Sequence, residues 1–403
     1  MKLSLMRYID ETVGTFLTRL LRFGIILKRL VVPVPAEVDR LEVRTVICQK
    51  YFGLGSILHA VPLVKALRYH YPNASIIFMT LPSNREVVEL CRIADEVRTI
   101  DTSSPLIFLR ELTSTLLYLL RKRVDISIDL EFFSKFSLFV SVLCGARRRV
   151  GLYMKKIRPG GVLTDKVFFN NYRHISEIYF AYAETVGIAR RPEFFDSLLP
   201  HMDAGVLERV MAKLSIPDNT RLIVVNVNVG TLSLSRRWPA EHFVRLIQRL
   251  VDSYPEYCYL LVGMESEFRY VENIAGRIGH NNNLINCAGM TTVPELFALI
   301  ESAFLFISCD SGPLHIASLY RKNLVGFYGP ETPIVYGPTN SNSLVFYSGK
   351  HYCSPCLSVY DSKKCLYGEL CPDNDCLRSI DPDAVFQTIE DRFLSRSSGM
   401  VEL

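Results

Sequence analysis

One stretch of the chain, residues 304–330, constrains the fold more than any other part of the sequence. Two apolar runs of strand type, Phe304–Ile307 and Leu324–Tyr328, flank a polar turn and a short helical segment, Leu314–Tyr320. This order of strand, tight turn, helix and strand is typical of a parallel α/β unit, in which ligands bind where the strands end. We therefore expect a binding site at the carboxyl end of the first of these strands.

The residues at that strand end suit an anion. Ser308, Asp310, Ser311 and Gly312 precede the helical segment, whose first turn offers free backbone N–H groups and a positive dipole end to a phosphate. Gly312 allows a close approach to the backbone, and Pro313 loses no hydrogen bond in a first helical turn. A helix cap supplied by Asp310 or Ser311 explains the same residues without a ligand.

Size and composition exclude several classes of protein. The 403 residues are enough for two domains, and contents of 49% apolar and 22% charged residues are typical of a folded globular protein. A net charge of +5 without a dense basic stripe does not favour nucleic-acid binding. The odd number of cysteines, 11, and the lack of a secretory signal favour a reducing cytosol.

Residues 1–40 are a separate segment in the sequence pattern. Charged residues interrupt its apolar positions too often for a membrane-spanning helix, which needs roughly 20 apolar residues. A basic amphipathic helix on an anionic membrane surface fits the pattern, and so does a helix packed on the protein's own body. The apolar positions at helical spacing are Leu5, Ile9, Val13, Phe16, Leu20 and Leu27, with Arg7, Arg19, Arg22, Lys28 and Arg29 among them.

From Arg44 onward, strands and helices alternate in two series. This pattern predicts the α/β class, with two Rossmann-like domains, residues 41–200 and 201–403, facing each other across a cleft. A stretch with two prolines, residues 190–201, indicates the linker. The expected strands are 46–48, 75–79, 97–100, 124–129 and 149–152, then 222–227, 257–262, 284–286, 304–307 and 324–327; the expected helices include 57–69 and 106–121.

Further ligand candidates follow the first two strands of the second domain. Arginine binds phosphate oxygens in bidentate fashion, although an exposed arginine can also simply cover the surface. Glu265 and Glu267 can accept hydrogen bonds from ribose hydroxyls, or they can complement a helix dipole. The turn after 222–227 carries Asn228, Thr231, Ser233, Arg236 and Arg237.

Four motifs occur along the two series: G-x-G-S at 53–56, R-R-W-P at 236–239, C-D-S-G-P-L-H-I-A at 309–317 and F-Y-G-P at 327–330. Taken together, they resemble glycosyltransferase family 9, the heptosyltransferase-like enzymes of lipopolysaccharide assembly. The resemblance spans roughly residues 44–390 and implies a GT-B fold with inverting sugar transfer that needs no metal. It also implies a nucleotide-diphosphate sugar donor, with ADP-heptose suspected, held mainly by the second domain.

The same resemblance assigns donor-binding residues by position. Arg236 stands where the family usually has a lysine two residues before Trp-Pro, and it would neutralise phosphate charge. Glu265 or Glu267 would bind the nucleoside of the donor. The residues around the donor pyrophosphate would be Asp310, Ser311, Gly312, Pro313 and Leu314, with His315 and Thr231 beside them.

One position departs from the family pattern. The family's N-terminal motif is Gly-Asp, with the aspartate as general base, but this chain has Ser56, which does not accept a proton near neutral pH as a carboxylate does. Glu131 is the replacement base that we predict, followed by Asp129 and His59. A helix-dipole carboxylate would explain Glu131 equally well, and Ser56 alone would suit a helix cap. The expected acceptor or phosphate contacts of this domain are Lys50, His59 and His174.

Five cysteines crowd the C-terminal part of the chain. Thiolates at these spacings can reach one tetrahedral zinc or iron ion, which would be structural. A reduced cluster or an adventitious disulfide is the alternative. The five are Cys353, Cys356, Cys365, Cys371 and Cys376.

The sequence thus predicts a glycosyltransferase that moves a heptose or related sugar to a lipid-linked saccharide such as lipopolysaccharide core. It would be cytoplasmic and peripheral, on the anionic inner face of a bacterial inner membrane. Ser56 favours the alternative of a non-catalytic nucleotide-sugar or saccharide-binding relative. An epimerase of nucleotide sugars is a third hypothesis, because folds host several chemistries. A dinucleotide oxidoreductase is disfavoured, because no G-x-G-x-x-G follows a first strand.

Overall fold

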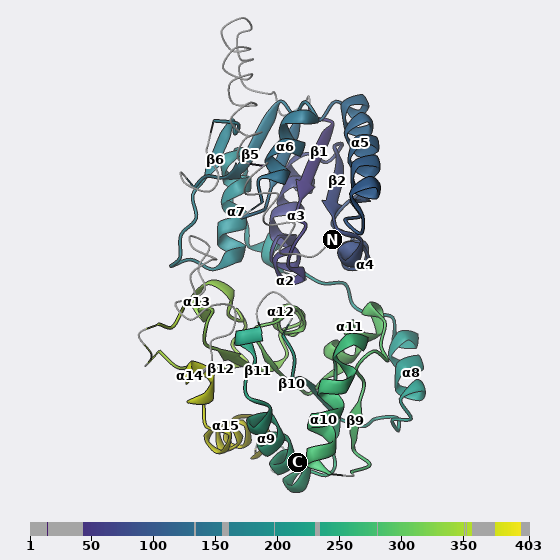
Figure 1. Ribbon diagram of the computed structural model, residues 1–403, viewed down its shortest axis with the longest axis vertical. Coiled ribbons are helices and arrows are strands. Elements are labelled where there is room, and N and C mark those ends of the chain that lie inside the picture. The colour runs from purple at the N-terminus through teal and green to yellow at the C-terminus, as the bar shows by residue number, and fades with distance from the viewer. Residues whose placement is uncertain are drawn as a thin grey trace, which may run out of the picture. The chain divides into compact units, whose positions relative to one another are not determined.

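The computed structural model describes residues 14, 43–132, 134–154, 161–196, 198–229, 234–279, 281–349, 351, 353–356 and 375–395 (Figure 1). The chain divides into two compact units, the first ending at Leu198 and the second beginning at Leu199. The amphipathic segment expected over residues 1–40 lies outside the described residues, except for residue 14. Within the described part of the chain, no helix is long and apolar enough to cross a membrane.

The first unit is a parallel six-stranded sheet with the order β3-β2-β1-β4-β5-β6, covered by helices on both faces (Figure 1). Its central strands, β1 (Thr45–Gln49) and β4 (Ile126–Asp129), are buried along their whole length. Its other elements are β2 (Ser75–Thr80), β3 (Glu96–Thr99), β5 (Arg148–Leu152), β6 (Asp165–Val167), α2 (Leu54–His59), α3 (Val61–His70), α4 (Arg85–Leu90), α5 (Pro105–Lys122), α6 (Phe136–Leu143) and α7 (Ile175–Thr185), with 3-10 turns η2 (Pro82–Asn84) and η3 (Pro192–Phe195).

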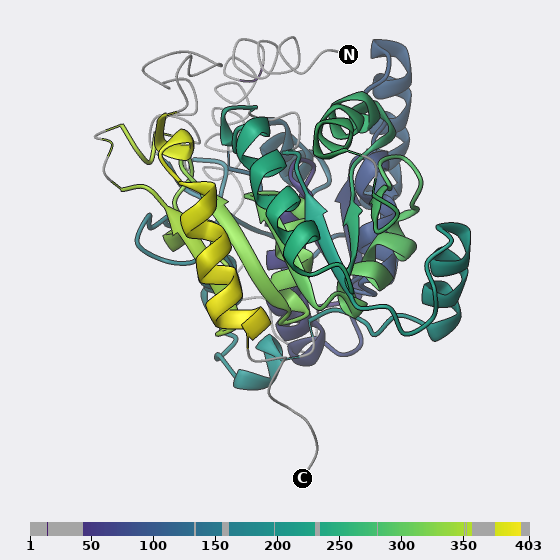
Figure 2. The same ribbon diagram turned by 90° about the horizontal axis from the view of Figure 1, so that it is seen from below.

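The second unit repeats this topology with the order β12-β11-β10-β7-β8-β9. Its strands are β7 (Leu222–Asn226), β8 (Cys258–Leu261), β9 (Leu284–Asn286), β10 (Leu305–Cys309), β11 (Asn323–Tyr328) and β12 (Ser343–Tyr347). Its helices are α8 (Ala204–Lys213), α9 (Ala240–Ser253), α10 (Phe268–Ile278), α11 (Val293–Ser302), α12 (Gly312–Leu319), α13 (Pro333–Tyr336), α14 (Asp375–Arg378) and α15 (Pro382–Ile389), with η4 (Leu234–Arg236), η5 (Glu265–Glu267) and a π-helical turn η6 (Glu390–Leu394). Figure 2 shows α15 lying beside α9 on one face of this sheet.

The shared strand order fixes where a ligand can bind. In each unit the first strand lies in the middle of the sheet beside the fourth, so the chain leaves these two strands in opposite directions. Such a switch point leaves a crevice at the carboxyl ends of the two strands, because the connections on either side diverge. The two switch points are β1/β4 in the first unit and β7/β10 in the second.

Two details differ from the sequence prediction. Each sheet has a sixth strand, β6 and β12, at one edge; β6 is three residues long and two of them are charged, so it has no apolar run to reveal it. The helix expected over residues 57–69 is two helices, α2 and α3, which meet at Ala60. Pro62 lies in the first turn of α3, where a residue without an N–H is tolerated, so a new helix starts there.

Trp238 fixes the segment that leads from the β7 switch point into α9. Its ring is buried and stacks on Phe327 of β11, with centroids 4.2 Å apart, and its edge meets Phe243 of α9. The indole N–H donates to the Ile380 carbonyl oxygen over 3.3 Å, which joins the α14–α15 connection to the same core. The motif R-R-W-P therefore places its two arginines by burying the tryptophan that follows them.

We predict that Trp238→Ala lowers the free energy of unfolding of the second unit by roughly 3–5 kcal/mol, the usual cost of emptying an aromatic core site. Trp238→Phe should cost less, because it keeps a ring against Phe327 and loses mainly the indole hydrogen bond. Urea unfolding followed by far-UV circular dichroism measures both, since Trp238 is the only tryptophan of the chain and its fluorescence is lost. A loss below about 1 kcal/mol in the alanine variant would contradict this account of the core.

Candidate functional site

A chain of hydrogen bonds joins the two strands of the second switch point. Asn226, the last residue of β7, lies opposite Ser308 of β10, and its side-chain N–H₂ donates to the hydroxyls of Ser308 (3.2 Å) and Ser311 (3.0 Å). The Ser311 hydroxyl accepts from the backbone N–H of Leu314 over 3.4 Å, so Ser311 is the N-cap of α12. The sequence allowed either Asp310 or Ser311 as the N-cap of this helix, and the structure shows that it is Ser311.

Asp310 is the buried carboxylate at the centre of this site. Nη1 of Arg236 lies 3.0 Å from its Oδ2, and Nε2 of His315 lies 3.6 Å from its Oδ1. Burial alone would raise the pKa of Asp310, but the charge of Arg236 and the contact with His315 outweigh it and hold the pKa below its ordinary value. Asp310 is therefore ionised at neutral pH and fixes the orientation of the Arg236 guanidinium.

Two buried donors lie in the segment that follows β7. Nε of Arg236 and the side-chain N–H₂ of Asn228 are fully buried and have no hydrogen-bond partner among the described residues. A buried donor without an acceptor costs free energy, so such groups in a crevice are ready to bind an acceptor-rich ligand. Arg237, by contrast, lies over the Tyr270 ring at 3.9 Å and donates to the Asn228 side-chain oxygen over 3.4 Å.

Glu331 also belongs to this site, although the sequence reading did not select it. It follows β11 and is partly buried; burial first, and then the nearby charge of Asp310, raise its pKa to about 8, against the opposing charge of Arg236. At pH 7 it is therefore mostly protonated and can donate a hydrogen bond. The sequence could have indicated Glu331 as a site residue, because it directly follows the strand end F-Y-G-P. It could have indicated Asn226 as well, because this asparagine ends the apolar run L-I-V-V-N.

The residues expected at the nucleoside lie after β8. Glu267 accepts from the Met264 backbone N–H over 2.8 Å, so it caps its own turn, whereas Glu265 is exposed on that turn. A side chain at Gly263 would come within 2.9 Å of the Asn228 amide nitrogen, so only glycine leaves this corner open. Thr231 lies outside the described residues. The nucleoside roles of the two glutamates stay predictions.

In the first unit, Glu131 organises the loop that follows β1. Its carboxylate accepts from the backbone N–H groups of Tyr51 (2.5 Å) and Phe52 (3.1 Å) and pairs with Nζ of Lys50 (3.2 Å). Lys50 and Glu131 are both buried, and the Glu131 N–H donates to the Asp129 carboxylate over 3.1 Å. Three of the predicted residues thus come together at the first switch point. Glu131 has these structural contacts, and its role as a base stays a prediction.

The other predicted residues of this unit lie on α2 and at the start of α7. The rings of His59 and His174 meet edge to face with centroids 5.1 Å apart, and Nδ1 of His174 accepts from the Ser176 N–H at the start of α7. Ser56 is partly exposed inside α2, whose N-cap is Gly53 at φ +85°. The idea that Ser56 caps this helix is therefore wrong, because the left-handed turn at Gly53 starts the helix two residues earlier.

The cysteine cluster is only partly described. Cys353 and Cys356 are partly exposed and Cys376 is buried, while Cys365 and Cys371 lie outside the described residues. Among the residues that can be placed, no three candidate metal ligands come together. The structural metal stays a prediction, which metal analysis of the purified chain checks.

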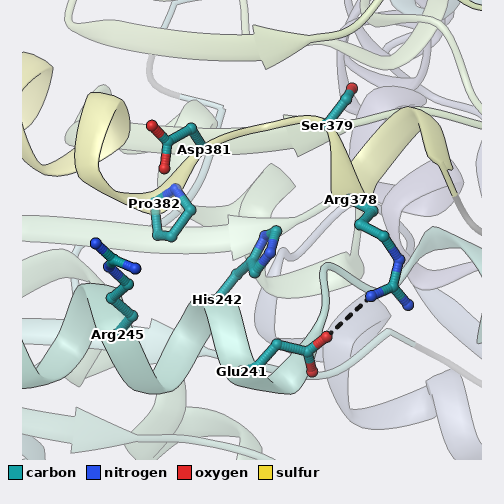
Figure 3. A pocket seen from close by; sticks show the side chains of 7 residues that line it. All are labelled: Glu241, His242, Arg245, Arg378, Ser379, Asp381 and Pro382. Carbon is teal, nitrogen blue, oxygen red and sulfur yellow. Dashed lines mark hydrogen bonds and ion pairs between the residues drawn. The ribbon is translucent and has the colours of Figure 1, made fainter.

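A separate pocket of about 430 Å³ lies between the start of α9 and the α14–α15 connection (Figure 3). Its two arginines are paired: Arg378 bonds Glu241 over 3.2 Å, and Arg245 pairs with Asp383. None of the predicted donor-binding residues lines it. The pocket is therefore distinct from the β7/β10 switch point.

Similarity to known proteins agrees with this geometry. Residues 210–367 match the family model of glycosyltransferase family 9 (heptosyltransferase), and this range contains the whole β7/β10 switch point. Over this range the chain is similar to glycosyltransferase family 9. The similarity indicates a glycosyltransferase, as the sequence predicted.

Relatives and solved structures extend the likeness beyond the family model. A lipopolysaccharide heptosyltransferase 3 of Escherichia coli is 34% identical over 94 residues, which span only 27% of that relative and 23% of this chain. Another, from Escherichia coli K12, is 22% identical over 329 residues, covering 90% of it and 77% of this chain. The structure of Escherichia coli ADP-heptose lipopolysaccharide heptosyltransferase II has a TM-score of 0.67 at 20% identity, covering 100% of that chain and 88% of this one.

Another similar structure contains iron. The iron-containing dodecameric glycosyltransferase TibC of Escherichia coli has a TM-score of 0.53 at 14% identity, and the likeness covers 79% of that chain and 90% of this one. At these identities the structures establish the fold alone. The α/β class with two Rossmann-like units, predicted from the sequence, is confirmed.

We predict that Glu331→Gln makes the protein more stable than the wild type at high pH. Because the folded protein keeps a proton on Glu331 between pH 4.5 and about 8 and the unfolded chain does not, wild-type stability falls as pH rises through this window. The difference in Tm between variant and wild type should grow from pH 5 to pH 8 and then level off. The control is Glu208→Gln, at an exposed position of α8. A Tm difference between Glu331→Gln and wild type that does not change with pH would contradict the raised pKa of Glu331.

Proposed function

We propose that this chain, which resembles family 9, transfers a sugar, a heptose or a close relative, from a nucleotide-diphosphate donor to a lipid-linked saccharide such as lipopolysaccharide core. ADP-heptose is the donor that we favour, because similar proteins are named for it. The observation that carries the proposal is the β7/β10 switch point. There a helix start, an oriented arginine and two buried donors without a partner among the described residues lie in the segments that follow the same two strands.

Within this site we assign each group a task. The first turn of α12, formed by Gly312, Pro313 and Leu314, would face the donor pyrophosphate with the Gly312 N–H, since Pro313 has no N–H and that of Leu314 is capped by Ser311. Asp310 holds Arg236, whose Nε is then directed to a phosphate oxygen. Protonated Glu331 would donate to another oxygen, because a neutral acid avoids repelling the anion. Glu265 would bind the ribose hydroxyls.

The reaction would be a single displacement that inverts the anomeric carbon. An acceptor hydroxyl oxygen attacks that carbon as the bond to the diphosphate oxygen breaks, and the nucleoside diphosphate leaves with the electron pair. A carboxylate of the first unit takes the hydroxyl proton. Donors that stabilise the charge of the leaving diphosphate supply the main rate gain at such sites. No metal takes part in this proposal.

We also propose that the protein is cytoplasmic and peripheral on the inner membrane, where a lipid-linked acceptor is accessible. The names of its relatives, which act on lipopolysaccharide or lipooligosaccharide, support this location. His59, His174 and Lys50 would line the acceptor side, near the first switch point.

The donor site has a direct test. Arg236→Gln should weaken binding of the favoured donor by roughly 10- to 100-fold, because a charged hydrogen bond to phosphate is lost. The control is Arg245→Gln, an exposed arginine of the same unit that pairs with Asp383. A nucleotide-sugar panel read by thermal shift and calorimetry measures both. Equal donor affinity in wild type and Arg236→Gln would show that the phosphate lies elsewhere.

The base is tested by turnover. Glu131→Gln should leave donor binding intact and lower kcat by about 10²- to 10⁴-fold, the usual effect of losing a general base. Asp125→Asn is the matched structural control, since Asp125 is also buried and accepts two backbone N–H groups, from Arg44 (2.8 Å) and Thr45 (3.0 Å). Release of nucleoside diphosphate in the presence of acceptor extract is the readout. If both variants lose only stability, Glu131 holds its loop and is not the base.

The non-catalytic alternative has one specific observation in its favour. Ser56 replaces the family's aspartate, and Glu131 is already bonded to three donors. If wild type binds a donor but no acceptor preparation makes it release nucleoside diphosphate, the chain is a nucleotide-sugar-binding relative.

A further inference from the structure

The outer face of α5 carries an unusual concentration of exposed leucines. Leu106, Leu109, Leu117 and Leu120 are 81%, 60%, 50% and 48% exposed, and Leu143 at the end of α6 is 45% exposed. Single exposed apolar residues are normal in soluble proteins, but a contiguous group marks a surface that something covers. Figure 1 shows α5 along an outer flank of the first unit.

The spacing of these leucines places them on one stripe. Positions 106, 109, 117 and 120 fall within about 80° of one another on a helix that turns 100° per residue. The opposite side of the helix carries Phe108, Leu112 and Leu119, which pack against the sheet core. The stripe is therefore not the face that folding buries. A side chain at Gly145 would lie 3.6 Å from Leu120, so the turn after α6, two residues past Leu143, lies beside the end of the stripe.

Basic residues border the same stripe. Arg110 and Arg121 lie next to it on the helix wheel, and Lys122 and Arg123 follow at its end; all four are exposed. The one acidic residue of α5, Glu111, is partly buried and accepts from the Asp101 N–H over 2.6 Å. At the end of the helix, Glu96 pairs with Arg98 and accepts from the Tyr118 hydroxyl. The exposed face of α5 thus carries leucines and positive charges, with the small polar residues Thr113 and Ser114 between them.

We propose that this leucine–arginine face of α5, extended by Leu143, docks the first unit onto an anionic lipid bilayer. Leucines beside arginine and lysine are typical of helices that lie in the plane of a membrane interface, with apolar side chains below the headgroups and cations among the phosphates. The stripe from Leu106 to Leu120 is about 21 Å long at 1.5 Å per residue, which suits a helix lying along the surface. A protein interface would more often contain aromatic residues and methionine, and this face has none among its exposed apolar positions.

This docking goes beyond the proposed transfer reaction and needs no turnover for its test. It also differs from membrane binding by residues 1–40, because it names a surface on the folded first unit. If the acceptor is lipid-linked, the same contact would keep the first unit at the surface where that acceptor lies.

The test uses the full chain and vesicles of phosphatidylglycerol and phosphatidylethanolamine, with pure phosphatidylcholine vesicles for comparison. In co-sedimentation, Leu106→Gln/Leu109→Gln/Leu117→Gln should reduce the partition coefficient on anionic vesicles by about tenfold or more, since each leucine loses its burial. Arg110→Gln/Arg121→Gln should reduce it by about fivefold per charge, and high salt should remove that difference. The controls are Ser114→Gln on the same helix and Val345→Gln, an exposed apolar residue of the second unit; both should bind like wild type.

A second readout reports the contact itself. Leu109→Cys labelled with a polarity-sensitive fluorophore should shift to the blue on anionic vesicles, and a label at Ser114→Cys should shift less. Wild-type binding by the triple variant, with no blue shift at position 109, would overturn the proposal. So would a loss of Tm in the triple variant, if residues 1–40 cover the stripe, or a change from oligomer to monomer in light scattering, if a second copy covers it.

Discussion

Both units depend on the same constraint: in a parallel sheet whose two faces are covered by helices, polar groups that are to meet a ligand lie where the strands end. The strands β1, β4, β7 and β10 are buried along their whole length, and a polar side chain inside them, such as Ser127, is hydrogen-bonded within the protein, to Gln49 and Ser141. The strand order then selects one point along that edge, between the first and fourth strands. The residues with chemical interest, from Asn226 and Asp310 in one unit to Lys50 and Glu131 in the other, lie at these two points.

The two switch points differ in how completely their buried charged groups are hydrogen-bonded. At β1/β4 the Glu131 carboxylate is bonded by a lysine and two backbone groups, so the cluster is closed on itself. At β7/β10 the Asp310 carboxylate pairs with Nη1 of Arg236. Nε of Arg236 and the side-chain N–H₂ of Asn228 have no hydrogen-bond partner among the described residues. A closed cluster rigidifies a loop, whereas an open one favours a ligand with many acceptor oxygens.

The sequence was most informative where periodicity and turn chemistry act together. The run from β10 through α12 to β11 was predicted in order, because its apolar strands are long enough to show and its helix starts with Ser-Gly-Pro. The edge strand β6 was missed because two of its three residues are charged, whereas β12, which reads S-L-V-F-Y, has an apolar run of strand type that the sequence prediction did not include. The contacts of Glu131 and the pKa of Glu331 were beyond sequence reasoning, because both depend on groups that are brought near by pairing of distant strands.

The repeated strand order has a consequence for how such a protein changes over time. Each unit completes its own sheet and its own core, and the boundary at residues 198 and 199 cuts through neither. A gene can therefore exchange the half that encodes one unit, or diversify its loops, while the other half keeps folding around an unchanged set of strands. With the donor on the second unit and the acceptor on the first, as proposed above, donor choice and acceptor choice would be separable traits, and recombination between relatives would be a short route to a new pairing of the two.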